Sequence, residues 1–150
     1  LEKLIIALLQ RVKTSSINIE GDHIAAIQEG ILVFIAFEKS DSENQVTRMT
    51  KRVLNYRIFS DCDEKMNKSV RDKNFDLLIV PQFTLAANTN TGNRPSFSNA
   101  ADPIKGKQLF LKFIDCISNQ YINTQHGVFG ANMQITLVND GPVTFWLQVK

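Results

Sequence analysis

Residues 137–144 read Leu-Val-Asn-Asp-Gly-Pro-Val-Thr and place a Gly-Pro pair between two strand-like runs, residues 134–138 and 143–149. Proline cannot donate a hydrogen bond to a neighbouring strand, so its presence inside a pairing region needs a reason. An X-Pro bond can also adopt the cis form at a cost of only about 0.5–1 kcal/mol. A tight turn of this kind, fixed by strands on both sides, would present two adjacent backbone carbonyls in one direction. A hairpin turn without any further role is the alternative.

Further strands are predicted where apolar residues alternate with polar ones or form short continuous runs. They cover residues 4–12, 16–20, 23–27, 31–37, 57–59 and 77–80. Gly21 and Asp22 separate the second of these strands from the third. With glycine first, this pair predicts a two-residue hairpin with a type II′ turn.

Two amphipathic helices are also predicted. Ser42 followed by Gln45 is a capping-box pattern, and Asp102 followed by Pro103 marks a second helix start. The apolar residues that follow at helical spacing are Val46, Met49, Val53 and Leu54 in the first helix and Leu109, Phe110, Phe113, Ile114 and Ile117 in the second. The pattern predicts an α+β fold, with a mostly antiparallel sheet and two packed helices in one domain over residues 1–150.

Composition narrows the functional class. The 150 residues suit one domain with a real core, and no apolar run approaches the roughly 20 residues that span a bilayer. A cytoplasmic protein without membrane contact is therefore predicted. The two cysteines lie far apart and the two histidines have no cysteine or carboxylate cluster around them, so we expect neither a metal site nor a cofactor.

The net charge of +2 permits RNA binding without indicating it. Arg48, Lys51 and Arg52 share one side of the first predicted helix. A second basic group follows and is interspersed with carboxylates; its members are Lys65, Lys68, Arg71 and Lys73, beside Asp61, Asp63, Glu64 and Asp72. A solvated face is the favoured interpretation for both groups, and a phosphate-contact surface is the alternative.

Four motifs in order along nearly the whole chain carry a family resemblance. They are Pro81-Gln82-Phe83-Thr84-Leu85-Ala86-Ala87-Asn88, Gly92-Asn93-Arg94-Pro95-Ser96-Phe97-Ser98, Gly127-Val128-Phe129-Gly130-Ala131-Asn132-Met133 and Asn139-Asp140-Gly141-Pro142-Val143-Thr144. Together they resemble the D-aminoacyl-tRNA deacylases, enzymes that hydrolyse the ester between a D-amino acid and tRNA. The resemblance implies a strongly curved, barrel-like sheet and a homodimer.

The resemblance points to Gln82, Phe83 and Thr84 as the catalytic segment, with backbone N–H groups of Phe83 and Thr84 forming an oxyanion hole. The alternative is that Phe83 and Leu85 are core residues, while Gln82 and Thr84 are solvent-facing strand positions. Thr84 and Thr144 are weak nucleophiles without an activating base, and the motifs contain hardly any titratable side chain. This fits the mechanism that the resemblance implies, in which the ribose 2′-hydroxyl of the tRNA assists and no covalent intermediate forms.

The resemblance also implies a cis bond at Gly141-Pro142 and its entry into the partner subunit's active site. The two carbonyls would hold the α-amino group and exclude an L side chain, which is selection by a clash against the wrong substrate. Glycine has no side chain to clash, so glycyl-tRNA would also be cleaved. Asn139 and Thr144, within the same motif, are predicted to bind substrate.

Three further residues are assigned by the resemblance. Phe129 and Met133 would line the pocket for the 3′-terminal adenosine, where an aromatic contact to a base contributes about 1–3 kcal/mol; core packing is the alternative for both. Arg11 would support the Gly-Pro turn, or else form an ordinary surface salt bridge. Arg94, in a loop predicted to flank the pocket, is a candidate phosphate contact.

One position departs from the family pattern. Pro81 stands where the family usually has serine, which removes a hydroxyl and a backbone N–H. We expect activity to persist with an altered rate. Two other interpretations stay open: a nucleotide or nucleic-acid binding module without turnover, and a small-ester hydrolase with Thr84 as nucleophile, which no feature favours.

Overall fold

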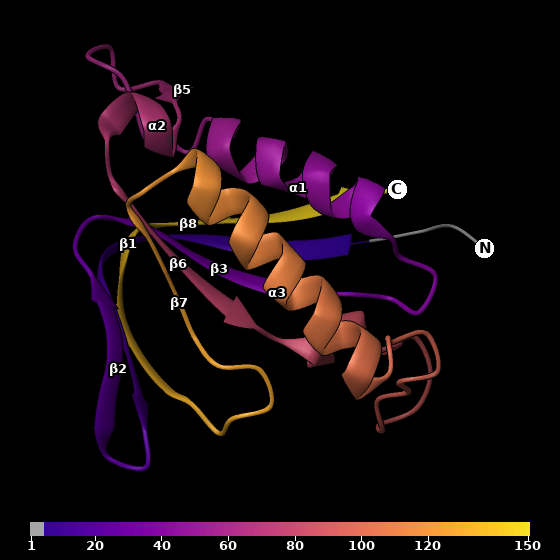
Figure 1. The fold of residues 1–150 in the computed structure, drawn as a ribbon. Helices are drawn as coiled ribbons and strands as arrows, with labels where there is room; N and C mark the ends of the chain where they lie inside the picture. Colours follow the sequence, from indigo (N-terminus) through magenta and orange to yellow (C-terminus); the bar gives the residue numbers. More distant parts are fainter. Residues whose placement is uncertain (1–4) are drawn as a thin grey trace.

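The computed structural model describes residues 5–150 and shows two long helices lying across one face of a curved sheet (Figure 1). The strands are β1 (Ile5–Ile19), β2 (Asp22–Ile27), β3 (Gly30–Ala36), β4 (Phe59–Ser60), β5 (Met66–Lys68), β6 (Asp76–Pro81), β7 (Thr124–His126) and β8 (Gln134–Val149). The helices are α1 (Glu43–Asn55), α2 (Val70–Lys73) and α3 (Pro103–Gln120), with a 3-10 turn, η1 (Phe83–Ala86), after β6.

β1 organises the sheet. It pairs antiparallel with β3 through its first half, with β2 through its second half, and with β8 from Ile5↔Val149 to Asn18↔Gln134. β6 then adds parallel to β3, and β7 parallel to β6. Because β1 changes neighbours along its length, the sheet curls toward a barrel. The predicted curved, mostly antiparallel sheet is confirmed, with two parallel pairings at one edge.

The two runs around Gly141-Pro142 form a single strand, so the hairpin alternative is wrong. Both runs pair with β1, as Gln10↔Thr144 on one side and Val12↔Asn139 on the other. Residues 140–143 therefore leave the ladder opposite Arg11 as an irregular bulge. Bulges of this kind re-aim backbone groups while the strand continues.

The turn between β1 and β2 also differs from the prediction. Ile19 pairs with Asp22, so the two turn residues are Glu20 and Gly21. Both have positive φ, 50° and 84°, which defines a type I′ turn and not the predicted type II′ turn at Gly21-Asp22. The predicted strands at 4–12 and 16–20 are one continuous strand from Ile5, since residues 13–15 extend the pairing; residue 4 lies outside the described residues.

Both predicted helices are confirmed. The backbone N–H of Ser42 donates to Gln45 Oε1 at 3.0 Å, and the Asp102 carboxylate accepts from the N–H of Lys105 at 2.9 Å. Their apolar stripes pack on the β1, β3 and β6 face of the sheet in one core that includes Met49, Phe110 and Phe113. α2 was not predicted, because one turn is too short to show helical periodicity.

The opposite face of the sheet is only partly covered. A smaller core lies where the sheet curls, around Ile17, Leu32 and Leu78. Near the free edge, Trp146 is 49% exposed opposite Leu8. No helix in the described part of the chain is long and apolar enough to cross a membrane.

Candidate active site

The Gln82-Phe83-Thr84 segment lies where β6 runs out of the sheet. The N–H of Gln82 makes a last bond to Ile35 O at 2.8 Å, and Leu85 N–H closes the 3-10 turn onto Gln82 O at 3.2 Å. The N–H groups of Phe83 and Thr84 thus stand at the start of a helical turn, where amides have no partner inside the turn. Such a pair of donors can bind a developing oxyanion.

The side chains of this segment contain amide and hydroxyl groups. Gln82 Nε2 donates a hydrogen bond to Thr84 Oγ1. An amide cannot take up the hydroxyl proton, so this partner orients Thr84 without activating it as a nucleophile. The geometry therefore gives no support to the esterase interpretation that used Thr84.

Phe83 is an exposed aromatic residue. Its side chain is 57% exposed, and its ring lies 5.2 Å from the ring of Phe97. Phe97 directly follows a loop that two backbone hydrogen bonds between Asn88 and Ser96 close, at 2.7 and 3.0 Å. The core-residue alternative for Phe83 is wrong, because the buried anchor of this segment is Ala86.

A cavity of about 290 Å³ opens beside the segment. Its lining is Val80, Pro81, Gln82, Phe83, Phe129, Gly130, Ala131, Asn132, Met133 and Ile135. The structure thus brings Phe129 and Met133 to the same cavity as Gln82 and Phe83, although Thr84 does not line it. No side chain of this lining titrates, so the cavity offers packing surface, amides and backbone groups.

Two glycines make room for the cavity's large side chains. A Cβ on Gly106, inside α3, would lie 3.1 Å from Phe129 Cζ, and one on Gly127 would lie 2.6 Å from Met133 Sδ. Phe129 and Met133 are also packed against the two cores, so the core and cavity interpretations both apply to them. Sequence reasoning missed Gly106; a glycine inside a helix, where it costs about 1 kcal/mol, was the available signal.

Arg11 contacts the Gly141-Pro142 turn through Asp140. The peptide bond is cis, and Gly141 has a φ of +126°. Arg11 donates from Nε to Asp140 O at 3.1 Å and from Nη1 to Ile58 O at 3.0 Å. Its Nε also lies 3.4 Å from Asp140 Oδ2. These contacts place Arg11 as a support of the turn, and Asp140 and Ile58 were not identified from the sequence.

The predicted site residues form two separate groups within the chain. Gln82, Phe83, Phe129 and Met133 share the cavity, whereas Asn139, Gly141, Pro142 and Thr144 do not line it and are exposed on the β8 bulge and its flanks. Arg94 is exposed in the loop beyond Asn88.

Proline fits at position 81 because of the strand geometry. In a parallel ladder the Ile35 carbonyl accepts from Gln82, so an N–H at position 81 would point away from β3. On that other side β7 pairs only with Leu77, Leu78 and Ile79. Pro81 is therefore at an edge position, where proline removes no ladder hydrogen bond.

One carboxylate lies near the segment. Glu38, together with residues 85–90, lines a depression beside η1. Burial, and secondly the negative charge of Asp41, raises the pKa of Glu38. In the described residues no group of His, Cys, Asp and Glu is arranged to hold a metal ion.

Comparison with known proteins decides the family. The model of the D-Tyr-tRNA(Tyr) deacylase family matches residues 8–148. The chain belongs to this family. The resemblance expected from the four motifs is confirmed.

Two D-aminoacyl-tRNA deacylases that are similar to this chain support the assignment to the family. The D-aminoacyl-tRNA deacylase of Escherichia coli O81 (strain ED1a) is 51% identical over 144 residues, which is 96% of this chain and 99% of the relative. That of Shigella boydii serotype 18 (strain CDC 3083-94 / BS512) is 50% identical over the same shares.

Two solved structures share the deacylase-family fold. One, titled as a c-Myc DNA unwinding element binding protein, is 34% identical, has a TM-score of 0.92 and matches over 97% of this chain and 99% of its own. The other, a probable eukaryotic D-amino acid tRNA deacylase, has a TM-score of 0.86 over 97% and 100% of the chains at 18% identity, which speaks for the fold alone.

Proposed function

We propose that this deacylase-family chain is an editing hydrolase that cleaves the ester of D-aminoacyl-tRNA to free tRNA and a D-amino acid. The proposal rests on one observation: the two amide donors at the start of η1 lie beside a cavity whose lining side chains do not titrate. An aminoacyl ester is already activated, so positioning and oxyanion stabilisation can supply much of the rate enhancement.

In the proposed reaction the N–H groups of Phe83 and Thr84 stabilise the oxyanion that forms on the ester carbonyl. The 2′-hydroxyl of the terminal ribose assists the attacking water, because the cavity side chains include no acid or base. Phe83, Phe129 and Met133 hold the terminal adenosine by stacking and packing. Collapse of the tetrahedral intermediate re-forms the C=O bond and breaks the bond to the ribose oxygen. That oxygen keeps the electron pair, takes up the proton given up by the attacking water and leaves with the tRNA, while the D-amino acid leaves with the water's oxygen in its carboxyl group.

Selection for the D configuration is assigned to the turn of Gly141 and Pro142 in a homodimer. The turn is exposed and does not line its own subunit's cavity, which supports a role in the partner subunit's cavity. There its two carbonyls would accept from the α-amino group and occupy the space that an L side chain needs. Glycyl-tRNA has no side chain to exclude and is therefore a second substrate.

The decisive experiment is a deacylation time course on matched D-tyrosyl-tRNA, L-tyrosyl-tRNA and glycyl-tRNA. We expect release from the D and glycyl forms only. Equal release from the L form would refute selection by the turn. Binding of tRNA without any release would favour the non-catalytic binding module. The name of the 34% identical protein, a DNA unwinding element binding protein, points to the same alternative.

The proposal treats residues 1–150 as one catalytic domain that needs no cofactor. Its substrate, charged tRNA, makes the cytoplasm the expected site of action. Both points are open to test by assaying the purified chain after chelator treatment and by locating the protein in fractionated cells.

A further inference from the structure

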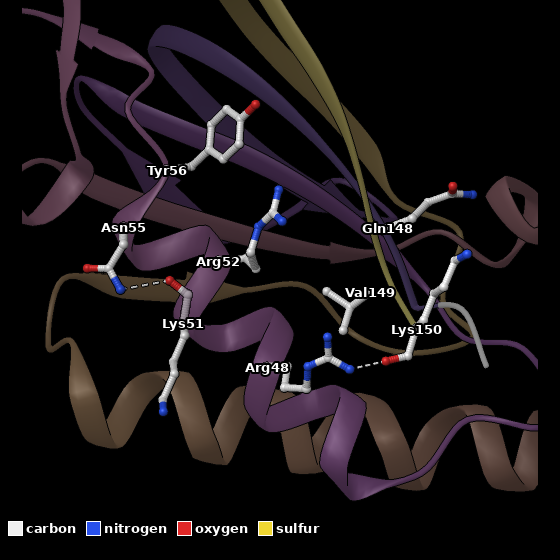
Figure 2. A pocket seen from close by; sticks show the side chains of 8 residues that line it. All are labelled: Arg48, Lys51, Arg52, Asn55, Tyr56, Gln148, Val149 and Lys150. Atoms are coloured by element: carbon white, nitrogen blue, oxygen red, sulfur yellow. Dashed lines mark hydrogen bonds between the residues drawn. The ribbon is translucent and has the colours of Figure 1, made fainter. Parts of the chain in front are cut away.

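A large open pocket lies away from the cavity, between the second half of α1 and the end of β8 (Figure 2). Its volume is about 650 Å³. The lining residues are Arg48, Lys51, Arg52, Asn55, Tyr56, Gln148, Val149 and Lys150. We call it the α1–β8 pocket.

The α1–β8 pocket is strongly positive. Four of its eight lining residues are Lys or Arg and none is Asp or Glu. Within residues 5–150 the ion pairs with carboxylates involve Arg11, Lys13 and Lys112, and none involves Arg48, Lys51 or Arg52. The positive charges of Lys51 and Arg52 are therefore not neutralised by these ion pairs.

Two guanidinium groups are held toward the pocket. Figure 2 shows Arg48 reaching from α1 to the end of β8 and Arg52 directed toward the Tyr56 side of the pocket, while Lys51 extends away from the strand. Arg48 Nη1 donates to the backbone carbonyl of Lys150, and the Arg52 guanidinium lies 5.7 Å from the centre of the Tyr56 ring. The planar donor fork of arginine matches a phosphate group, and a side chain that is already positioned loses less entropy on binding one.

A chain of contacts connects the Gly141-Pro142 turn to the pocket, whose lining on β8 begins at Gln148. Arg11 connects Asp140 of the turn to Ile58, which follows α1, through hydrogen bonds of 3.1 and 3.0 Å. Tyr56, at the end of α1, packs its ring 5.3 Å from that of Phe145. The order of residues away from the turn is thus Phe145 and Tyr56, then Arg52, then Arg48.

The second basic group lacks these properties. Lys68 lies within electrostatic reach of Asp61 and Asp72, and the segment around it also carries Asp63 and Glu64. Its positive charges are thus largely balanced by neighbours, which makes Lys68 a matched control for Arg52.

We propose that the α1–β8 pocket binds backbone phosphates of the RNA that carries the ester. This inference rests on the proposed function, because it takes the ligand of the Gly141-Pro142 turn to be an aminoacyl-tRNA. The subunit that contributes the turn would then also hold the RNA strand leading away from the terminal adenosine. Phosphate contacts of this kind add affinity and register without reading base sequence.

The test measures the Kd of uncharged tRNA against salt concentration for the wild type, Arg52→Gln, Arg48→Gln and Lys68→Gln, with a thermal unfolding midpoint for each. Loss of one phosphate contact should reduce the slope of log K against log salt by about 1 and weaken binding most at about 50 mM salt. We expect this for Arg52→Gln and Arg48→Gln, partial rescue in Arg52→Lys, and no such change for Lys68→Gln.

Turnover of the D-tyrosyl ester of adenosine, which has no phosphate, separates the two proposals. The change in KM caused by Arg52→Gln should be larger for D-tyrosyl-tRNA than for this small ester. An unchanged salt slope, an equal effect of Lys68→Gln, an equal KM effect on both substrates, or no tRNA binding by the wild type would each overturn the inference. Failure of the wild type to cleave either ester would instead refute the proposed function, whatever the tRNA affinities are.

Discussion

Gly141 combines a backbone conformation and a close environment that only glycine satisfies. Its φ is +126°, and a Cβ would lie 2.9 Å from Val143 Cγ2 and 3.1 Å from an Arg11 guanidinium nitrogen. Gly21, in the β1–β2 turn, has a φ of +84° with nothing within 4 Å of the same Cβ position. A side chain at Gly21 would therefore meet backbone strain alone, whereas one at Gly141 would meet backbone strain and close neighbours.

Gly141→Ala should lower the free energy of unfolding by about 1–3 kcal/mol, since a strained backbone residue costs this much. It should also displace the Arg11 side chain, and so slow the deacylation of D-tyrosyl-tRNA and relax discrimination between D- and L-tyrosyl-tRNA. Chemical denaturation and the deacylation time course measure the two effects. Gly21→Ala, the control, should lose stability but keep its selectivity. Full selectivity and activity in Gly141→Ala would show that the turn does not choose the substrate.

Pro81→Ser tests the departure from the family pattern. A serine N–H at this position would point away from β3, so the sheet should be unaffected. Removing proline frees the unfolded chain, and we expect a loss of about 0.4–1 kcal/mol in unfolding free energy. Deacylation of D-tyrosyl-tRNA should stay within about tenfold, a factor worth 1.36 kcal/mol in the barrier. An inactive Pro81→Ser enzyme would mean that proline shapes the cavity in this chain.

At the scale of single residues, the sequence supports prediction where chemistry is local. Gln82, Phe83, Phe129 and Met133, which the motifs assign to the site, line one cavity, and their roles there stay predictions. Ile58 could not be foreseen, because its contribution is a backbone carbonyl that any residue has. Gly106 leaves space for the Phe129 ring, and because the two residues are distant in the sequence, no local pattern predicts this contact.

At the scale of elements, periodicity identified α1, α3 and the central strand β3, because each buries one face or both. It divided β8 into two strands, since Gly141 and Pro142 look like a turn in any local window. The pairing partner, β1, lies more than a hundred residues away and decides that the strand continues on both sides. The same long-range pairing merged the two predicted strands at the start of the chain.

The cap of α2 gives a pH-dependent prediction. The backbone N–H and the hydroxyl of Ser69 hydrogen-bond to Asp72 and lower the pKa of its carboxyl group. A carboxyl group with a lowered folded-state pKa contributes stability above its unfolded-state pKa, and this contribution is lost as pH falls through the folded-state value. Asp72→Asn should therefore be less stable than the wild type at neutral pH and should lose less stability between about pH 5 and pH 2.

Thermal midpoints measured across this pH range check the prediction. Asp115→Asn, at an exposed position in the middle of α3, is a suitable control and should follow the wild-type curve. Parallel curves for the wild type and Asp72→Asn would show that the cap does not carry the acid dependence.

At the scale of the whole molecule, the sheet has one face covered by α1 and α3 and another with apolar side chains at its surface. Leu8 and Phe34 are half-buried there, and Trp146 beside them is 49% exposed. Apolar surface of this kind on a sheet is typical of a contact between subunits. The same chain leaves its cavity and its Gly141-Pro142 turn apart, and the proposed dimer with composite sites would account for both observations.

Complementation between two impaired variants tests the composite site. Gly141→Ala removes the turn but keeps Phe83, and Phe83→Ala removes an aromatic wall of the cavity but keeps the turn. Each homodimer should be impaired on D-tyrosyl-tRNA.

When the two variants are unfolded together and refolded at equal amounts, half of the dimers are mixed, and each mixed dimer has one intact site. About a quarter of the wild-type site number should then return, because a twofold-symmetric dimer has two equivalent sites. Activity no higher than the mean of the two homodimers, with mixed dimers shown by mass spectrometry, would place the turn and the cavity in the same subunit.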